Sequence, residues 1–161
     1  MGKALNKNDV FGGTSARQVD APTAPLTKQL FSLWQSKCGA DDMPLRHEMD
    51  AASLQSMMPY IYIVDILDDG ADFCMRFMGS AIVQSIGRDY TGVKASENKD
   101  AESNWRALVY RSVYEARKPM FTRVPLSDFE RSHVMTECAL LPLANRHGDF
   151  SMIMCCATPL Q

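Results

Sequence analysis

The sequence predicts an α+β protein in which a five-stranded antiparallel sheet carries helices on one face and is capped by an N-terminal helix. The order of the segments leads to this prediction, because two strands come first, then short helices and one long helix, and then three more strands. Strands that come in runs, without regular helix alternation, favour an antiparallel sheet with a helical layer. We expect the strands at residues 60–67, 73–78, 120–126, 133–143 and 150–158.

The first two strands are predicted to form a hairpin. Apolar residues dominate 60–67 and 73–78, and the acidic segment 68–72 between them contains a glycine, as tight turns often do. A short helix then runs between Gly79 and Gly87, and the second glycine suits the end of a helix. Strand, turn, strand and short helix therefore make up the first part of the domain.

Two more helices are expected before the last three strands. The long one covers residues 101–117, where apolar residues recur with helical spacing, and Pro119 ends it. The short one covers residues 51–58, with Asp50 as its N-cap and Pro59 as its stop. These helices can cover one face of the sheet.

The N-terminal helix is expected to begin at Thr27 and to end before Gly39. Leu30, Leu33 and Trp34 share one face of it, so this face must pack against something. The last two strands are apolar at both alternating positions, so the second face of the sheet also needs a cover. The helix either docks on that face or forms the interface of a homodimer, for which these three residues are the candidates.

Length suggests one domain, since the chain has 161 residues. Residues 1–25 contain prolines and glycines but few large apolar side chains, which is typical of a flexible leader. We expect the N-terminal helix and a linker at residues 26–42 and the main domain at residues 43–161.

Composition narrows the classes of partner. The formal net charge is −2, which argues against nucleic acid or an acidic membrane surface as the main partner. The five cysteines show no C-x-x-C spacing, so they indicate free thiols in a reducing compartment. The sequence shows neither a cleavable signal nor an apolar stretch of membrane-spanning length, and we expect a soluble, cytoplasmic protein.

Several motifs, in their order and spacing over residues 26–158, resemble a single-domain PAS family of alphaproteobacteria. They are the Trp34 helix, Pro44-x-Arg46 before Asp50, Pro59-Tyr60-Ile61, Arg76-Phe77-Met78-Gly79-Ser80, Gly87-Arg88-Asp89-x-Thr91-Gly92, and Glu137-Cys138-Ala139-Leu140-Leu141-Pro142-Leu143 followed by Gly148. The resemblance implies a five-stranded antiparallel sheet with a helical layer and a role in sensing or relaying signals through protein contacts. It implies no fixed ligand and no catalytic set.

Three ionisable residues, Asp65, Arg76 and Glu137, occupy inward-looking positions of apolar strands. An unpaired charge in a core costs several kcal/mol, so each should have a partner. A regular hairpin would place Asp65 and Arg76 diagonally across adjacent strands, within reach of each other. Arg76 is a candidate ligand-binding residue, because its guanidinium group suits an anionic ligand. Glu137 is a second candidate ligand-binding residue. The alternative for Arg76 is an ion pair or a charge that reaches solvent.

The sheet and the central helices are expected to enclose a cavity. Eleven methionines would make such an interior adaptable, and small-molecule pockets are mostly apolar with a few polar groups. The alternative is that the same residues form ordinary core. The candidate lining residues are Met78, Ile82, Ile86, Trp105, Val109 and Leu140.

No cofactor and no metal is indicated by the sequence. His47, His133 and His147 are isolated, and none has the paired spacing that metal or haem attachment motifs use. The alternative to the absence of a cofactor is a bound haem.

The sequence therefore predicts a sensor or adaptor rather than an enzyme. We expect it to bind an unknown small molecule or a signalling protein, to work as a homodimer, and to respond by a population shift between two packings. One alternative is a small cavity enzyme of the isomerase or thioesterase type, in which Glu137 or Asp65 would act as general base. Another is a structural adaptor without a ligand.

Overall fold

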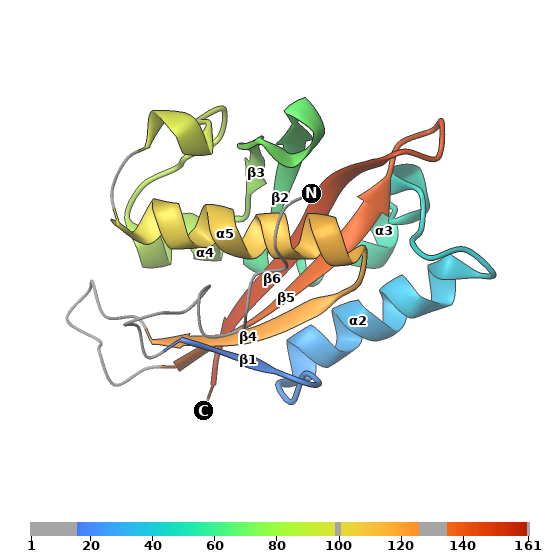
Figure 1. Ribbon diagram of the computed structural model, residues 1–161. Coiled ribbons are helices and arrows are strands. Elements are labelled where there is room, and N and C mark those ends of the chain that lie inside the picture. Colours follow the sequence, from blue (N-terminus) through green and yellow to red (C-terminus); the bar gives the residue numbers. More distant parts are fainter. Residues whose placement is uncertain (1–15, 99–100, 126–134, 161) are drawn as a thin grey trace.

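The computed structural model describes residues 16–98, 101–125 and 135–160, and for residues 101–105 it describes the backbone alone. At its centre lies an antiparallel sheet of six strands in the spatial order β1-β4-β5-β6-β2-β3 (Figure 1). The strands are β1 (Arg17–Val19), β2 (Ile61–Leu67), β3 (Asp72–Met78), β4 (Met120–Pro125), β5 (Met135–Ala144) and β6 (Phe150–Pro159).

Strands β2 to β6 are the five that the sequence predicts, and β1 is an addition. Arg17–Val19 pairs with β4 at the sheet edge, with Val19 opposite Phe121, so the expected flexible leader at residues 1–25 is corrected in its last part. A strand of three residues is too short to give a readable alternation of apolar and polar side chains. Residues 126, 133 and 134, which the prediction assigned to strands, lie outside the described residues.

Helices cover the sheet on both sides. They are α2 (Pro25–Cys38), α3 (Ala51–Leu54), α4 (Ser80–Ile86) and α5 (Ala101–Ala116), with the single turns η1 (Arg46–Glu48), η2 (Met58–Tyr60), η3 (Asp68–Gly70) and η4 (Ala95–Glu97). Asp50 caps α3 by accepting a hydrogen bond from the backbone N–H of Ser53, as expected, but the helix ends at Leu54 rather than at residue 58. Within the described residues, none of the helices has the length and apolar character needed to cross a bilayer.

The two faces of the sheet carry separate apolar clusters. Leu30 and Trp34 of α2 pack with Leu141 of β5 and other residues on one face. Val109 and Val113 of α5 pack on the other face. Because neighbouring residues of a strand point to opposite faces, β5 supplies both clusters, and this explains why the last strands are apolar at both alternating positions.

Helix α2 docks on the sheet of its own chain. Leu30 is 0% exposed and Trp34 is 5% exposed, and the indole N–H of Trp34 donates a 2.8 Å hydrogen bond to the carbonyl of Pro142. Phe31 packs edge-on against Phe121 of β4. Leu30 and Trp34 are therefore buried within one chain, as in the alternative in which the helix docks on its own sheet, and their role in a homodimer interface stays a prediction. Leu33 is half-buried and packs at the edge of the same cluster.

Candidate ligand-binding site

A cavity of about 570 Å³ lies between the sheet and helices α4 and α5. Five of the six expected lining residues lie on its wall, namely Met78, Ile82, Ile86, Val109 and Leu140. The side chain of Trp105 lies outside the described part of the structure. The remaining lining residues are Tyr60, Tyr62, Met75, Ala81, Gln84, Ser85, Arg106, Tyr110, Thr122, Val124, Thr136, Cys138, Ala157 and Pro159.

Strands β4 and β5 supply their parts of the wall through every second residue. On β4 these are Thr122 and Val124, and on β5 they are Thr136, Cys138 and Leu140. This is the period of two that a β-strand imposes on its side chains. The residues between them point to the α2 side of the sheet.

Two tyrosines place phenol groups in the wall of the cavity. Tyr62 and Tyr110 both line the cavity, and Tyr62 of β2 lies directly opposite Cys155 of β6. Burial raises the pKa of both tyrosines well above the usual value, so both stay neutral at physiological pH. Neutral phenols can donate hydrogen bonds to a ligand.

The thiol of Cys138 is also part of the wall. Burial raises its pKa to about 11, although a hydrogen bond with the side chain of Thr122 acts in the opposite direction. A thiol with this pKa is protonated near neutral pH and is a poor nucleophile. The cavity therefore presents Cys138 as a weakly polar surface.

Arg106 of α5 is the basic residue of the cavity wall, and sequence reasoning missed it. It also lines a smaller adjoining cavity of about 90 Å³, together with Lys94 and Asn98. The signal was present in the sequence, since Arg106 stands three and seven residues before Val109 and Val113 and therefore shares their face of the helix. A basic residue within an apolar helical stripe is a candidate contact for an anionic group.

The candidate Arg76 lies outside both cavities. Its Nε donates hydrogen bonds of 2.8 and 3.0 Å to the two carboxylate oxygens of Asp65, which confirms the predicted pairing. The Arg76 side chain is 55% exposed, so this is the ion-pair alternative and not a ligand anchor. A bulge between Ile63 and Val64 shifts the register of β2 and β3 and leaves Arg76 as the extra residue, which changes the face of the sheet that it reaches.

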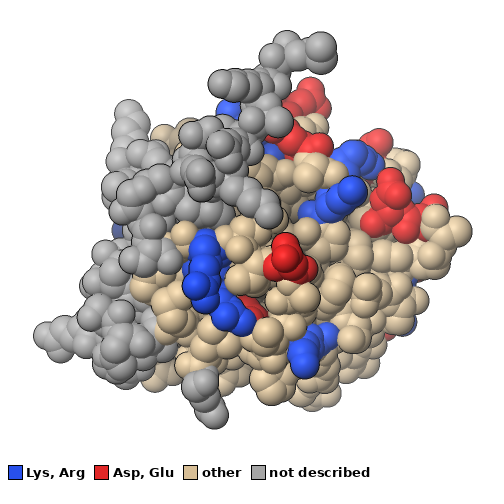
Figure 2. All heavy atoms as spheres, turned by 60° about the horizontal axis from the view of Figure 1, so that its bottom comes forward, with Lys and Arg blue, Asp and Glu red and all other residues tan. Residues whose placement is uncertain are grey.

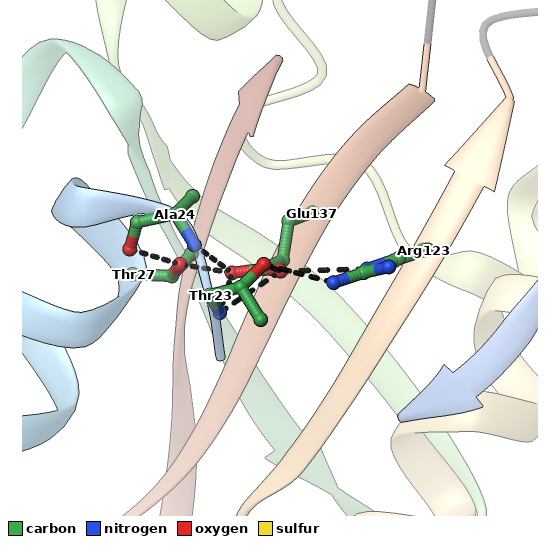
Figure 3. A network of polar contacts seen from close by, with 5 residues as sticks. All are labelled: Thr23, Ala24, Thr27, Arg123 and Glu137. Carbon is green, nitrogen blue, oxygen red and sulfur yellow. Dashed lines mark hydrogen bonds and ion pairs between the residues drawn. The ribbon is translucent and has the colours of Figure 1, made fainter. Parts of the chain in front are cut away.

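Glu137 also lies outside the cavity, on the opposite face of the sheet, and is 0% exposed. Its carboxylate accepts hydrogen bonds from the N–H groups of Thr23 and Ala24, each at 2.9 Å at its shortest, just before α2 begins (Figure 3). The hydroxyl groups of Thr23 and Thr27 donate to the same carboxylate. The candidate ligand-binding role of Glu137 is therefore corrected: it holds the N-terminal end of α2.

Arg123 completes this network. Its Nε lies 3.5 Å from Oε2 of Glu137, and its Nη2 donates a 2.8 Å hydrogen bond to the hydroxyl oxygen of Thr23. Burial alone would raise the pKa of Glu137, but the hydrogen bonds from Thr27, Ala24 and Thr23 together hold it below the usual value. Glu137 is thus a charged carboxylate that is buried among matched donors.

The lining of the two cavities limits the chemistry they can support. None of the described lining residues is an aspartate, glutamate or histidine. Glu137 and Asp65, the carboxylates that the enzyme alternative requires, both lie elsewhere. Among the described residues, no cluster of three or more His, Cys, Asp or Glu side chains could hold a metal ion. His133 lies outside the described residues.

Charged side chains are spread thinly over the face of the molecule shown in Figure 2. Lys and Arg residues lie there singly or in small groups among uncharged residues, with Asp and Glu residues between them. Among the described residues on this face, there is no broad basic field of the kind that nucleic-acid binding uses.

Comparisons with known proteins place the chain in a family. A family model described as a PAS domain matches residues 23–158. Among solved structures, the chain is similar to one described as "Structure of an RNA-binding Light-Oxygen-Voltage Receptor", with 14% sequence identity and a TM-score of 0.49. The similarity covers 91% of this chain and 39% of that one, so the chain spans well under half of the receptor's length. No curated protein matches the chain.

Proposed function

Because the chain belongs to the PAS domain family, we propose that it is a sensory module that binds a small molecule in the 570 Å³ cavity and passes the signal on through contacts with another protein. The observation that carries this proposal is the cavity itself. Its volume falls in the range of about 300–1,000 Å³ that is usual for small-molecule sites. Its wall is mostly apolar and adds a few polar groups, as such sites do.

The lining supports a ligand with an apolar body and an anionic group. Met75, Met78 and Leu140 offer adaptable apolar contacts to the body. Arg106 offers a permanent positive charge to the anionic group, and the neutral hydroxyl of Tyr110 adds a hydrogen-bond donor nearby. Arg106 lines both cavities, so the anionic group would lie where they adjoin.

Three probes with the same ten-carbon chain test this ligand class: decanoate, decanol and decylamine. We expect decanoate to bind at least tenfold more tightly than the other two by isothermal titration calorimetry. Arg106→Gln should bring decanoate to the affinity of decanol, since the charge is removed. Arg111→Gln is the matched control, because Arg111 is an exposed residue of the same helix and should leave the order unchanged.

A variant that blocks the cavity tests the location. Ala157 lines the cavity from β6, so Ala157→Leu places a larger apolar side chain inside it. This variant should weaken binding of all three probes. Equal affinity of decanoate for wild type, Arg106→Gln and Ala157→Leu would show that the probe binds elsewhere and would contradict the proposal. Native mass spectrometry of freshly purified protein would identify a retained natural ligand.

To pass the signal on, the protein would have to contact other protein chains. A homodimer and a signalling partner are proposed from the family, and the five free cysteines support a location in a reducing compartment such as the cytoplasm. Since Leu30 and Trp34 are buried within one chain, a dimer would need another surface or an exchange of α2 between subunits. Sedimentation velocity at several protein concentrations, with and without decanoate, tests the dimer. A monomer under all conditions would contradict it.

A further inference from the structure

The paired strands β4 and β5 perform two tasks on their two faces. Thr122 lies opposite Cys138, and both side chains line the cavity. The next cross-strand pair, Arg123 opposite Glu137, lies on the α2 side. Neighbouring residues of a strand are about 3.3 Å apart along it. The wall of the cavity and the attachment of α2 are therefore built on consecutive residues of the same two strands.

The attachment is concentrated in one short segment. Pro22 and Pro25 have no backbone N–H, so Thr23 and Ala24 supply the two N–H groups of residues 22–25. Both donate to the carboxylate of Glu137. These two N–H groups therefore report directly on whether the carboxylate holds the helix.

A buried carboxylate makes this attachment sensitive to geometry. Glu137 is 0% exposed, so each lone pair that loses its donor leaves charge unsolvated, and such a loss costs several kcal/mol. A small change in the twist of β4 against β5 would move Arg123 and Glu137 relative to the segment before α2. Such a movement would open the network to water.

We propose that occupancy of the cavity controls how firmly Glu137 holds the N-terminal end of α2. This inference rests on the proposed function, since it assigns the regulation of the same cavity. A ligand that contacts Thr122 and Cys138 restricts the motion of β4 against β5. The restricted strands keep Arg123 and Glu137 in position, so an occupied cavity closes the network more fully and an empty one lets α2 open more often.

Amide hydrogen exchange tests the coupling, with decanoate as the probe. We expect exchange at Thr23 and Ala24 to slow by about fivefold or more on saturation, the lower end of usual coupling between two sites. The amide of Gly148, which lies in the β5–β6 turn and bonds to Asn145, should not change. Unchanged or faster exchange at Thr23 and Ala24, with decanoate bound, would overturn the coupling and leave the cavity as a ligand site.

One variant makes the test independent of the probe. Ala157 pairs with Cys138, and Ala157→Leu fills part of the cavity from the protein itself, so it should slow the same two amides without any ligand. If decanoate fails to bind, the proposed ligand class fails, and this variant still decides the coupling. Unchanged exchange in Ala157→Leu would then overturn it.

Coupling is reciprocal, which gives a second readout. Glu137→Gln should weaken decanoate binding by the same factor by which decanoate slows the two amides, although Glu137 is not in the cavity. Thr27→Val removes one donor at nearly constant volume and is the milder variant if Glu137→Gln does not fold. An affinity for decanoate that equals wild type in both folded variants would overturn the coupling.

Discussion

Arg123 and Glu137 lie directly opposite each other on β4 and β5, and the arginine Nε is 3.5 Å from the carboxylate oxygen Oε2. This pair joins two parts of the chain that are more than 100 residues apart, because Glu137 also accepts hydrogen bonds from Thr23, 114 residues before it. The arrangement is charged, buried and almost fully paired, and the first two predictions below depend on it.

Glu137→Gln should lower the free energy of unfolding by about 3 kcal/mol, because loss of one partner from a buried charged network typically costs this much. The neutral amide keeps one oxygen, but its NH₂ group faces the N–H donors of Thr23 and Ala24. Urea denaturation followed by circular dichroism measures the change. Glu115→Gln, on the exposed side of α5, is the control and should stay within about 0.5 kcal/mol of wild type.

Stability should fall as the pH is lowered through the acid range. The pKa of Glu137 is lowered in the folded protein from its usual value of 4.5, so its contribution is fully present above about 4.5 and is lost as the pH falls through the folded value. Denaturation curves between pH 7 and pH 3 measure this loss. Glu137→Gln should show a shallower decline, although lowered pKa values of Asp50, Asp72 and Asp89 leave part of it. An identical decline in both proteins would contradict this role.

Arg76→Ala should leave decanoate binding unchanged and cost at most about 1 kcal/mol of stability, the usual upper value for an exposed ion pair. Its side chain is 55% exposed and pairs with Asp65 outside the cavities. Calorimetric titration measures the effect on decanoate binding, and thermal unfolding measures the effect on stability. A tenfold loss of probe affinity would show that Arg76 is a ligand contact after all.

Gly79→Ala should destabilise the protein by more than about 3 kcal/mol or prevent folding. A methyl group at this position would overlap the backbone carbonyls of Met58 and Pro59, which cannot move aside as a flexible side chain can. Gly87→Ala is the matched control, since Gly87 has φ of 86° but open space around it. Its cost should stay near 1 kcal/mol, the penalty for a left-handed alanine. Similar melting temperatures for the two variants would contradict this difference.

Much of the fold could be predicted from the sequence because its elements are long enough to show a period. The helix Ala101–Ala116 and the strands after it agree with the expected segments to within two residues over the described part of the chain. The edge strand Arg17–Val19 could not be predicted, since it exists only through its pairing with β4.

The site was predictable in its apolar part and not in its charged part. Met78, Ile82 and Val109 follow the periods of their elements, and they line the cavity. Glu137 and Leu140 were expected in one site, although their spacing of three residues puts them on opposite faces of a regular strand. The face of the sheet that Arg76 reaches depends on a β-bulge, and this bulge forms through the pairing of β3 with β2. Single-sequence patterns do not reveal such pairing.

The long separation between Thr23 and Glu137 has a consequence for biosynthesis. Helix α2 (Pro25–Cys38) leaves the ribosome long before β5 (Met135–Ala144) and β6 (Phe150–Pro159), the strands on which its apolar side rests. Until those strands emerge, the native cluster around Leu30 and Trp34 is incomplete, and exposed apolar surface of this kind promotes aggregation. The nascent chain therefore depends on its last strands to complete the burial of the apolar side of α2.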